Sequence, residues 1–348
     1  MTKIAILGGA GELGRALAAR LARPGRELVL VDRAGAALER AAAAHGARAL
    51  AAELGNPEVL APLCAERALL VHCAGPFRGH SDALARACAE RGATCIDASD
   101  DRGYCERVLA LDALAREKGA LLLTAGGAHA VLTSAAVASV DEQFAALNEI
   151  WIAWALGAAT PIGAARRAGY EAGRGQSFEM KLGGEWTTRA VLGDERWAEF
   201  PAPLGRTRVV NVDAPETKLF TDRRRINMVR VSAVQPPHGL AALTGRFTGR
   251  GARDGEVLAL WMRGTDNGRL PMERRVCVHG GDAAHAIASV PLACLVERVL
   301  ASASAGAAAI EPGARAATGL VAWDVLRPAL AASGVRELRG DLGGWRAA

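Results

Sequence analysis

Six residues near the start of the chain form a loop suited to holding phosphate groups. Gly9-Ala10-Gly11-Glu12-Leu13-Gly14 has the spacing G-x-G-x-x-G. In this pattern the first glycine permits a tight turn, the second lets the backbone approach a pyrophosphate, and the third lets a helix pack closely on a strand. Free amides at the start of that helix then face the phosphate charge. The loop is therefore predicted to bind a dinucleotide.

An acidic residue follows the loop at the distance expected for contact with a ribose. Asp32 lies 18 residues after Gly14 (32 − 14) and is predicted to accept hydrogen bonds from the ribose hydroxyls. Its charge disfavours a 2′-phosphate, whereas the adjacent Arg33 favours one. We expect NAD as cofactor, with NADP left open. Leu54 is expected near the adenine, with a surface position as the alternative.

Two titratable side chains follow later predicted strands. Asp97 ends the short apolar run that begins at Thr94, and it is suited to binding an ammonium group or relaying a proton. The alternative is a helix N-cap. His129 follows the last predicted parallel strand, and an imidazole that titrates near neutral pH is suited to general acid catalysis. Its alternative is a hydrogen-bonded loop histidine.

The turn Gly75-Pro76-Phe77 also lies just beyond a predicted strand. Phe77, Arg78 and His80 are expected at the substrate, where Arg78 and His80 are suited to receiving a carboxylate, with a surface position as the alternative.

The residues that open this turn are predicted to contact the cofactor instead. They are Cys73, Ala74, Gly75 and Pro76. Cys73 is expected to do so through its backbone. No partner that would activate Cys73 as a nucleophile is evident.

Alternating strands and helices are predicted to carry these residues. The predicted strands are Lys3–Leu7, Glu27–Val31, Ala47–Ala51, Ala68–His72, Thr94–Ile96 and Leu121–Thr124. The predicted helices are Glu12–Arg23, Ala34–His45, Pro57–Cys64, Ser81–Arg91 and Asp101–Lys118. Such alternation favours a parallel sheet covered by helices on both faces, in which ligands bind at the carboxyl ends of the strands.

The second half of the chain has a different pattern. After a helix predicted over Leu132–Leu147, apolar and polar residues alternate with a period of two, which is typical of antiparallel strands. These segments are Glu149–Ala155, Ser177–Leu182, Arg206–Val212, Ile226–Val234, Glu256–Arg263 and Arg274–His279. The predicted fold class is α/β, a doubly wound parallel Rossmann sheet with a second α+β domain built on a mainly antiparallel sheet.

Three segments are predicted from these patterns. Residues 1–126 are expected to form the dinucleotide-binding domain and residues 127–281 a substrate and dimerisation domain. Residues 282–348 are expected to form a helical segment that packs back on the first domain, with a last helix over Ala322–Ala332 before a glycine-rich tail.

Composition limits the possible partners. The net charge of +5 over 348 residues is far from the dense basic stripe of a nucleic-acid-binding protein, and no apolar run reaches the roughly 20 residues that span a bilayer. The N-terminus lacks the apolar core of a signal peptide, so we expect a cytoplasmic protein. No metal-ligand spacing is found, and no metal is expected. Neither a Tyr-x-x-x-Lys pair nor a hydrolase or P-loop motif occurs.

Several motifs together resemble the saccharopine dehydrogenase family. The most distinctive is Val71-His72-Cys73-Ala74-Gly75-Pro76-Phe77, followed after a helix by Thr94-Cys95-Ile96-Asp97. The segments Gly184-Glu185-Trp186, Phe200–Arg206, Asp213-Ala214-Pro215 and Gly313-Ala314-Arg315 are similar to the second half of such proteins. The resemblance covers nearly the whole chain. One departure is Ala128-His129-Ala130, where many relatives have a proline-containing turn.

This resemblance implies NAD(P) in the first domain, a small-molecule substrate, a homodimer, and hydride transfer between an imine and a secondary amine, with His129 or Asp97 handling the proton. Two alternatives stay open. One is a reductase of C=C or C=O bonds on the same scaffold. The other is a non-catalytic dinucleotide-binding sensor or partner protein. This alternative is suggested by the altered turn at His129.

Overall fold

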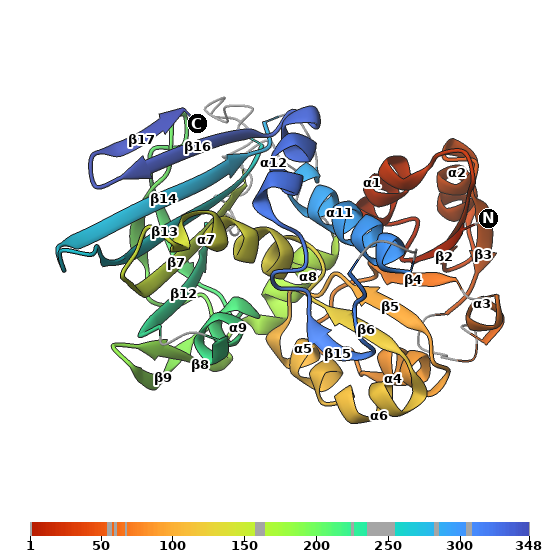
Figure 1. Cartoon of the computed structure of the whole chain (residues 1–348). Coiled ribbons are helices and arrows are strands. Elements are labelled where there is room, and N and C mark those ends of the chain that lie inside the picture. The colour runs from red at the N-terminus through yellow and green to blue at the C-terminus, as the bar shows by residue number, and fades with distance from the viewer. Residues whose placement is uncertain are drawn as a thin grey trace. The chain divides into compact units, whose positions relative to one another are not determined.

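A computed structural model describes residues 2–53, 58, 61–66, 68–156, 164–223, 226–234, 255–281, 285–303 and 308–347. The chain divides into two compact units (Figure 1). The first contains Met1–Val131 and Ala288–Val321, and the second contains Leu132–Ile287 and Ala322–Ala348. Each unit therefore includes a segment from the C-terminal part of the chain.

A seven-stranded parallel sheet forms the centre of the first unit, with strand order β15-β6-β5-β4-β1-β2-β3. The strands are β1 (Thr2–Leu7), β2 (Arg26–Asp32), β3 (Arg48–Ala51), β4 (Leu69–His72), β5 (Thr94–Asp97), β6 (Leu121–Thr124) and β15 (Gly313–Ala316). The order reverses between β1 and β4, and ligands of such sheets bind outside the carboxyl ends of the strands at this point.

Helices cover both faces of this sheet (Figure 1). They are α1 (Glu12–Leu21), α2 (Ala36–Ala44), α3 (Ala61–Ala65), α4 (Ala83–Glu90), α5 (Arg102–Leu109), α6 (Asp112–Lys118) and α11 (Ala286–Ser302). Ala5 and Leu7 of β1 pack in the apolar layer formed with α3, α4, α5 and α6. Ile4 and Ile6 point to the opposite face because side chains alternate along a strand, and both are fully buried.

An eight-stranded mixed sheet forms the second unit, with strand order β10-β11-β12-β7-β13-β14-β16-β17. Its strands are β7 (Ala146–Leu156), β10 (Arg196–Glu199), β11 (Arg206–Asn211), β12 (Met228–Ala233), β13 (Glu256–Thr265), β14 (Pro271–His279), β16 (Arg336–Asp341) and β17 (Gly344–Ala347). Only β12 and β7 pair in parallel among these described strands. A separate hairpin is formed by β8 (Ser177–Leu182) and β9 (Glu185–Ala190).

The helices of the second unit are α7 (Thr133–Asp141), α8 (Ala164–Gly173), α9 (Glu216–Arg223) and α12 (Trp323–Ala332). The α7 and α12 helices contact each other, and they pack on β13 and β16 respectively. A five-residue π-helical turn, Ala128–Leu132, precedes α7.

The predicted fold class is confirmed, and the segment predicted over residues 282–348 differs from the structure. We expected one helical segment there. Instead, β15 completes the parallel sheet, and the glycine-rich tail forms the β16–β17 hairpin of the other sheet. The α11 helix is tied to the first unit because Arg26 donates two 2.6 Å hydrogen bonds to Glu297. The helix predicted over residues 101–118 is two helices, α5 and α6.

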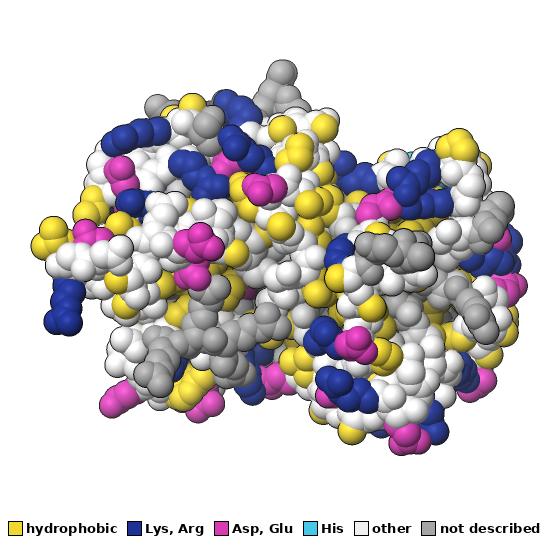
Figure 2. Space-filling view, viewed as in Figure 1, with side chains coloured by type: hydrophobic (Ala, Val, Ile, Leu, Met, Phe, Trp, Pro, Cys, Tyr) yellow, Lys and Arg dark blue, Asp and Glu magenta, His cyan; other side chains and the backbone are white. Residues whose placement is uncertain are grey.

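Acidic and basic side chains are interspersed over the face of the molecule drawn in Figure 2. No helix in the described part of the chain is long and apolar enough to cross a membrane.

Candidate functional site

The glycine loop connects β1 to α1, and its sharpest turn lies one residue before the predicted motif. Gly8 has a φ of +80°, a left-handed conformation that favours glycine, and a Cβ there would lie 2.7 Å from the backbone nitrogen of Ala74. The turn that we assigned to Gly9 is therefore made by Gly8, which the sequence reasoning missed. Gly9 instead lies against β2, since a Cβ on it would lie 2.7 Å from Cβ of Leu30.

The end of the motif brings α1 against the loop. A Cβ on Gly14 would lie 2.2 Å from the carbonyl oxygen of Gly8, so only glycine allows this close packing. Gly11 is the N-cap residue of α1 and supplies no side-chain hydrogen bond to the helix. Glu12 and Leu13 open the helix and are half-buried. The loop and helix start thus have the shape and backbone amides that a pyrophosphate requires.

Asp32 ends β2 beside this loop. Its Oδ2 accepts a hydrogen bond from the backbone amide of Ala10 at 3.0 Å, and its Oδ1 accepts one from the amide of Arg33 at 2.8 Å. The carboxylate is half-buried, whereas Arg33 is exposed. Asp32 therefore fixes the glycine loop relative to β2 and keeps a negative charge at the predicted ribose position. Leu54 lies outside the described residues.

The four predicted cofactor contacts after β4 form a half-buried turn next to the glycine loop. The amide of Cys73 donates a 2.8 Å hydrogen bond to the carbonyl of Leu7, and Ala74 packs against Gly8. The Gly75–Pro76 peptide bond is cis. Burial, together with nearby Asp97 and Cys95, raises the pKa of the Cys73 thiol, which disfavours the reactive thiolate.

Phe77, which is expected at the substrate, is packed in the apolar core. Its side chain is 4% exposed, and its ring centroid lies 5.1 Å from that of Tyr104 and 4.9 Å from that of His72. Both contacts have the edge-to-face geometry of aromatic packing. The sequence places Phe77 at the turn, but the burial of its ring depends on Tyr104, which comes from α5.

His72 ends β4, and sequence reasoning assigned it no role. Burial, aided by the neighbouring His80, lowers the pKa of His72 to about 3, so the ring is neutral at neutral pH. Its Nδ1 accepts a 3.4 Å hydrogen bond from the amide of Ala74. The His80 ring lies parallel to His72 at 6.3 Å between centroids, and burial lowers the pKa of His80 as well.

Arg78, predicted to receive a substrate carboxylate, lies close to a carboxylate of the protein. Its Nε lies 3.6 Å from Oδ2 of Asp101. The other oxygen of Asp101 accepts a 2.8 Å hydrogen bond from the amide of Tyr104 and so caps α5. A substrate at Arg78 would therefore share this guanidinium with Asp101.

Asp97 lies at the carboxyl end of β5, and three donors converge on one of its oxygens. Oδ1 accepts hydrogen bonds from the amide of Ser99 at 3.0 Å, the hydroxyl of Thr124 at 3.0 Å and the amide of Ala125 at 3.1 Å. Within the described part of the chain, no hydrogen bond reaches Oδ2. The N-cap alternative for Asp97 does not hold, because Asp101 caps the helix that follows.

Burial raises the pKa of Asp97 from 3.8 to about 6, although the three hydrogen bonds to Oδ1 act in the opposite direction. The side chain is only 3% exposed, and burial in a low dielectric disfavours the carboxylate form. Asp97 can therefore gain or lose a proton within reach of neutral pH, which general acid or base chemistry requires.

The backbone after β6 is shaped around Asp97. Ala125 has a φ of +56°, which is costly for a residue with a side chain, by about 1 kcal/mol or more. This conformation directs its amide to Oδ1 of Asp97, while the amide of Gly126 donates a 2.6 Å hydrogen bond to the Asp97 carbonyl. No sequence pattern singles out Thr124 or Ala125, since both look like ordinary strand-end residues.

His129 lies in the π-helical turn after β6 and is half-buried. It belongs to the first unit, as do the other predicted site residues that the structure describes. Two groups of predicted residues are brought together, namely the glycine loop with Asp32 and the turn after β4, and Asp97 with the end of β6.

Comparison with known proteins agrees with this arrangement. Residues 4–123 match the family model described as the saccharopine dehydrogenase NADP binding domain. A relative from Arabidopsis thaliana named "probable mitochondrial saccharopine dehydrogenase-like oxidoreductase" is 37% identical over 79 residues, which are 22% of this chain and 17% of the relative. The saccharopine dehydrogenase-like oxidoreductase of Homo sapiens is 31% identical over 98 residues, 26% of this chain and 23% of the relative. The matched segment thus spans about a fifth of these relatives.

Among solved structures, the chain is similar to saccharopine dehydrogenase (L-Glu forming) from Saccharomyces cerevisiae. The TM-score is 0.70 over 98% of this chain and 100% of the other, with 12% identity. At this identity the likeness concerns the fold, and it extends over both units. The family resemblance found in the sequence is confirmed by the family model over residues 4–123.

Proposed function

We propose that this chain, whose residues 4–123 are a dinucleotide-binding domain of the saccharopine dehydrogenase type, is an NAD(P)-dependent oxidoreductase that interconverts an imine and a secondary amine of a small molecule. The observation that carries the proposal is the state of Asp97. Its carboxyl group lies at the carboxyl edge of the parallel sheet, titrates at about pH 6 and has one oxygen held by three donors.

When bound, a nicotinamide cofactor would supply or accept the hydride. In the reductive direction Asp97 gives a proton from Oδ2 to the imine nitrogen as the carbon receives the hydride, and in the oxidative direction it takes that proton back. The donors on Oδ1 keep the carboxyl group oriented during both steps. Removing such a proton-transfer group typically slows a reaction by about 10²- to 10⁴-fold.

NAD is the cofactor that we propose, because the Asp32 carboxylate is fixed by the amides of Ala10 and Arg33 and would repel a 2′-phosphate. Arg78 and His80 are proposed to contact the substrate, with Arg78 shared between a substrate carboxylate and Asp101. His129 is proposed as a second polar group near the reacting atoms. A homodimer in the cytoplasm remains our proposal from the family resemblance.

The test uses the full chain with NADH or NADPH and a panel of 2-oxo acids combined with amines. We expect oxidation of the reduced cofactor and formation of a secondary amine, identified by product mass. The Asp97→Asn variant should lose about 100-fold in kcat while its affinity for the dinucleotide is unchanged. Asp100→Asn is the matched control, because Asp100 is an exposed carboxylate three residues away.

The pH profile distinguishes a proton donor from a structural residue. Reduction needs protonated Asp97, so kcat should fall as the pH rises above about 6, and oxidation should show the opposite trend. A product with a reduced C=C or C=O bond would contradict imine chemistry. Tight dinucleotide binding without turnover across the panel would instead identify a sensor, and full activity of Asp97→Asn would remove Asp97 from the mechanism.

A further inference from the structure

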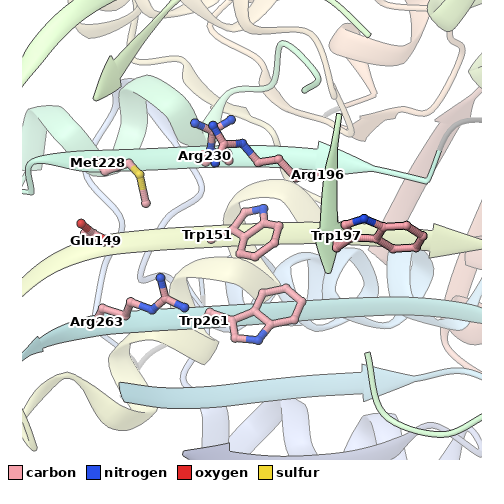
Figure 3. A pocket seen from close by; sticks show the side chains of 8 residues that line it. All are labelled: Glu149, Trp151, Arg196, Trp197, Met228, Arg230, Trp261 and Arg263. Carbon is pink, nitrogen blue, oxygen red and sulfur yellow. The ribbon is translucent and has the colours of Figure 1, made fainter. Parts of the chain in front are cut away.

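A second candidate site lies wholly within the second unit. Side chains of β7, β10, β12 and β13 enclose a pocket of about 450 Å³ on one face of the mixed sheet (Figure 3). This volume lies within the range of about 300–1,000 Å³ that is typical of small-molecule sites. No residue of the proposed dinucleotide site takes part in it.

A row of side chains across three strands forms the floor of the pocket. Arg230 of β12 is opposite Trp151 of β7, which in turn is opposite Trp261 of β13. The two indole rings stack with centroids 4.7 Å apart and planes inclined by 30°. Trp151 is further fixed because its Nε1 donates a 3.1 Å hydrogen bond to Ser232. The floor is therefore aromatic, with Trp151 half-buried and Trp261, which is 3% exposed, packed beneath it.

Arg230 brings a positive charge into this floor. Its side chain is 4% exposed, and Nη1 donates a 2.7 Å hydrogen bond to the neutral amide oxygen of Asn211. Among the described residues no carboxylate pairs with Arg230. Burial lowers its pKa to about 10, so the guanidinium stays charged at neutral pH. The nearby carboxylate of Asp194 offsets part of the cost of burying this charge, and it accepts a 3.0 Å hydrogen bond from Nδ2 of the same Asn211. An anion that paired directly with the guanidinium would remove more of that cost.

The wall formed by β10 adds a second unpaired cation and a third aromatic ring. Arg196 lines the pocket and forms no ion pair in the described part of the chain. The neighbouring Trp197 is 48% exposed, and Arg206 and Arg208 lie over its ring at 4.8 and 5.0 Å. Figure 3 shows Arg196 and Arg230 near the middle of the pocket, with Trp197 at one end.

The opposite end of the pocket is electrically balanced. Arg263 shares the Glu273 carboxylate with Arg275: its Nε lies 2.5 Å from Oε2, and Nε of Arg275 lies 2.6 Å from Oε1. Glu149 supplies a second negative charge at this end. Glu149 lies in the row next to Trp151, between Met228 of β12 and Arg263 of β13. The excess positive charge is therefore concentrated at Arg196 and Arg230, where the indole surface begins.

We propose that this pocket binds a small carboxylate anion with a flat, unsaturated or aromatic body. The carboxylate pairs with Arg230 and Arg196 through charge-assisted hydrogen bonds, and the body lies on the stacked rings of Trp151 and Trp261. The inference goes beyond the proposed oxidoreductase activity and does not depend on it.

The test uses benzoate as the probe and isothermal titration calorimetry of the full chain. Benzoate should bind, whereas the neutral isostere benzamide should bind at least about tenfold more weakly. Arg230→Gln and Arg196→Gln should each weaken benzoate binding about tenfold, and Trp197→Ala a few-fold. Arg196 and Trp197 are surface residues, so these two variants keep the test valid if Arg230→Gln folds poorly.

Arg346→Gln is the matched control. Arg346 is exposed on β17, outside the pocket, and pairs with Asp341 at 3.5 Å, so benzoate affinity should not change. Equal affinity for benzoate and benzamide would overturn the proposal. So would unchanged binding in both pocket-arginine variants, or absence of binding at about 10 mM benzoate. None of these readouts uses a dinucleotide, so failure here is distinct from failure of the proposed function.

Discussion

The two candidate sites differ in whether burial leaves their ionisable groups charged at neutral pH. At the edge of the parallel sheet, His72 of β4 is opposite Asp97 of β5. Burial lowers the pKa of His72 to about 3 and raises that of Asp97 to about 6, so both shifts favour the neutral form. On the mixed sheet, burial lowers the pKa of Arg230 only to about 10, and the charge persists. The first site is therefore suited to exchanging a proton. The second keeps its positive charge and is suited to holding an anion.

The two sites also differ in which part of the chain builds them. Backbone amides and the absence of a side chain at Gly8 and Gly14 shape the dinucleotide site. Long side chains from neighbouring strands shape the pocket on the mixed sheet. Adding a methyl group should therefore damage the first site most, and truncating or neutralising a side chain should damage the second.

The largest expected effect is that of Gly14→Ala. The new Cβ would lie 2.2 Å from the carbonyl oxygen of Gly8, so backbone must shift, at a cost of about 3 kcal/mol in the free energy of unfolding. Dinucleotide binding should be lost with the loop geometry. Urea unfolding and titration with NADH measure the two effects.

Gly103→Ala is the matched control for that variant, because Gly103 is also a helix glycine. A Cβ there would meet only side-chain atoms, at 3.4 Å, and helix propensity favours alanine by about 1 kcal/mol. Retained NADH affinity in Gly14→Ala would show that the loop does not depend on close backbone packing.

A second prediction concerns stability against pH. Between about pH 4 and pH 6, His72 makes the free energy of unfolding rise with pH. The reason is that its imidazole is protonated in the unfolded state but stays neutral when buried in the folded state. Asp97 makes stability fall, because the folded state binds its proton more tightly. Each slope is at most about 1.4 kcal/mol per pH unit, so the two effects largely cancel in the parent chain.

Removing one partner should reveal the slope of the other. In Asp97→Asn the free energy of unfolding should rise with pH between about pH 4 and pH 6, because only the effect of His72 remains. Above pH 7 this variant should be more stable than the parent by up to about 3 kcal/mol, because no buried carboxylate is left. His72→Asn should leave the falling slope of Asp97. Urea unfolding across this pH range measures both, and parallel profiles for the two variants would contradict the assignment.

Arg230→Gln sharpens the comparison on the side of the mixed sheet. Removing this buried charge, which no carboxylate of the described residues contacts directly, should raise the free energy of unfolding by about 1 kcal/mol in the absence of an anion. The control Arg346→Gln should change it by less than about 0.5 kcal/mol. Destabilisation by Arg230→Gln would indicate that the guanidinium has a structural role instead of a binding role.

A further prediction concerns Asp32, the acidic residue at the predicted ribose position. Asp32→Ser should shift the ratio of Kd values for NADH and NADPH about tenfold toward NADPH, since repulsion of a 2′-phosphate is removed. Asp100→Asn should leave this ratio unchanged. An unaltered ratio in Asp32→Ser would show that Arg33, and not Asp32, decides the preference.

The sequence predicts the first site better than the second for a physical reason. The glycine loop, Asp32 and Asp97 each follow a strand directly, and the carboxyl ends of parallel strands meet at one edge. The turn at Gly8 and the packing of Phe77 on Tyr104 were missed because they depend on neighbours outside the local sequence.

The pocket on the mixed sheet was not predicted, although three of the four strands that carry it, β7, β12 and β13, were. Trp151 and Trp261 lie in strands predicted from their alternation, yet their stacking depends on the register between β7 and β13. A shift of one residue would turn either ring to the opposite face of the sheet. The four-residue strand β15 was missed for a related reason, since its partner β6 lies far earlier in the sequence.

The place of β15 has a consequence for how the protein is made. The chain passes from one unit to the other after Val131, returns after Ile287 and leaves again after Val321. Residues 313–316 must therefore leave the ribosome before β15 can form and pair with β6. Until then β6 is the edge strand of the dinucleotide-binding sheet. An N-terminal fragment that ends near residue 131 carries the glycine loop but exposes that edge and lacks α11. The dinucleotide-binding sheet is thus complete only when nearly the whole chain has emerged.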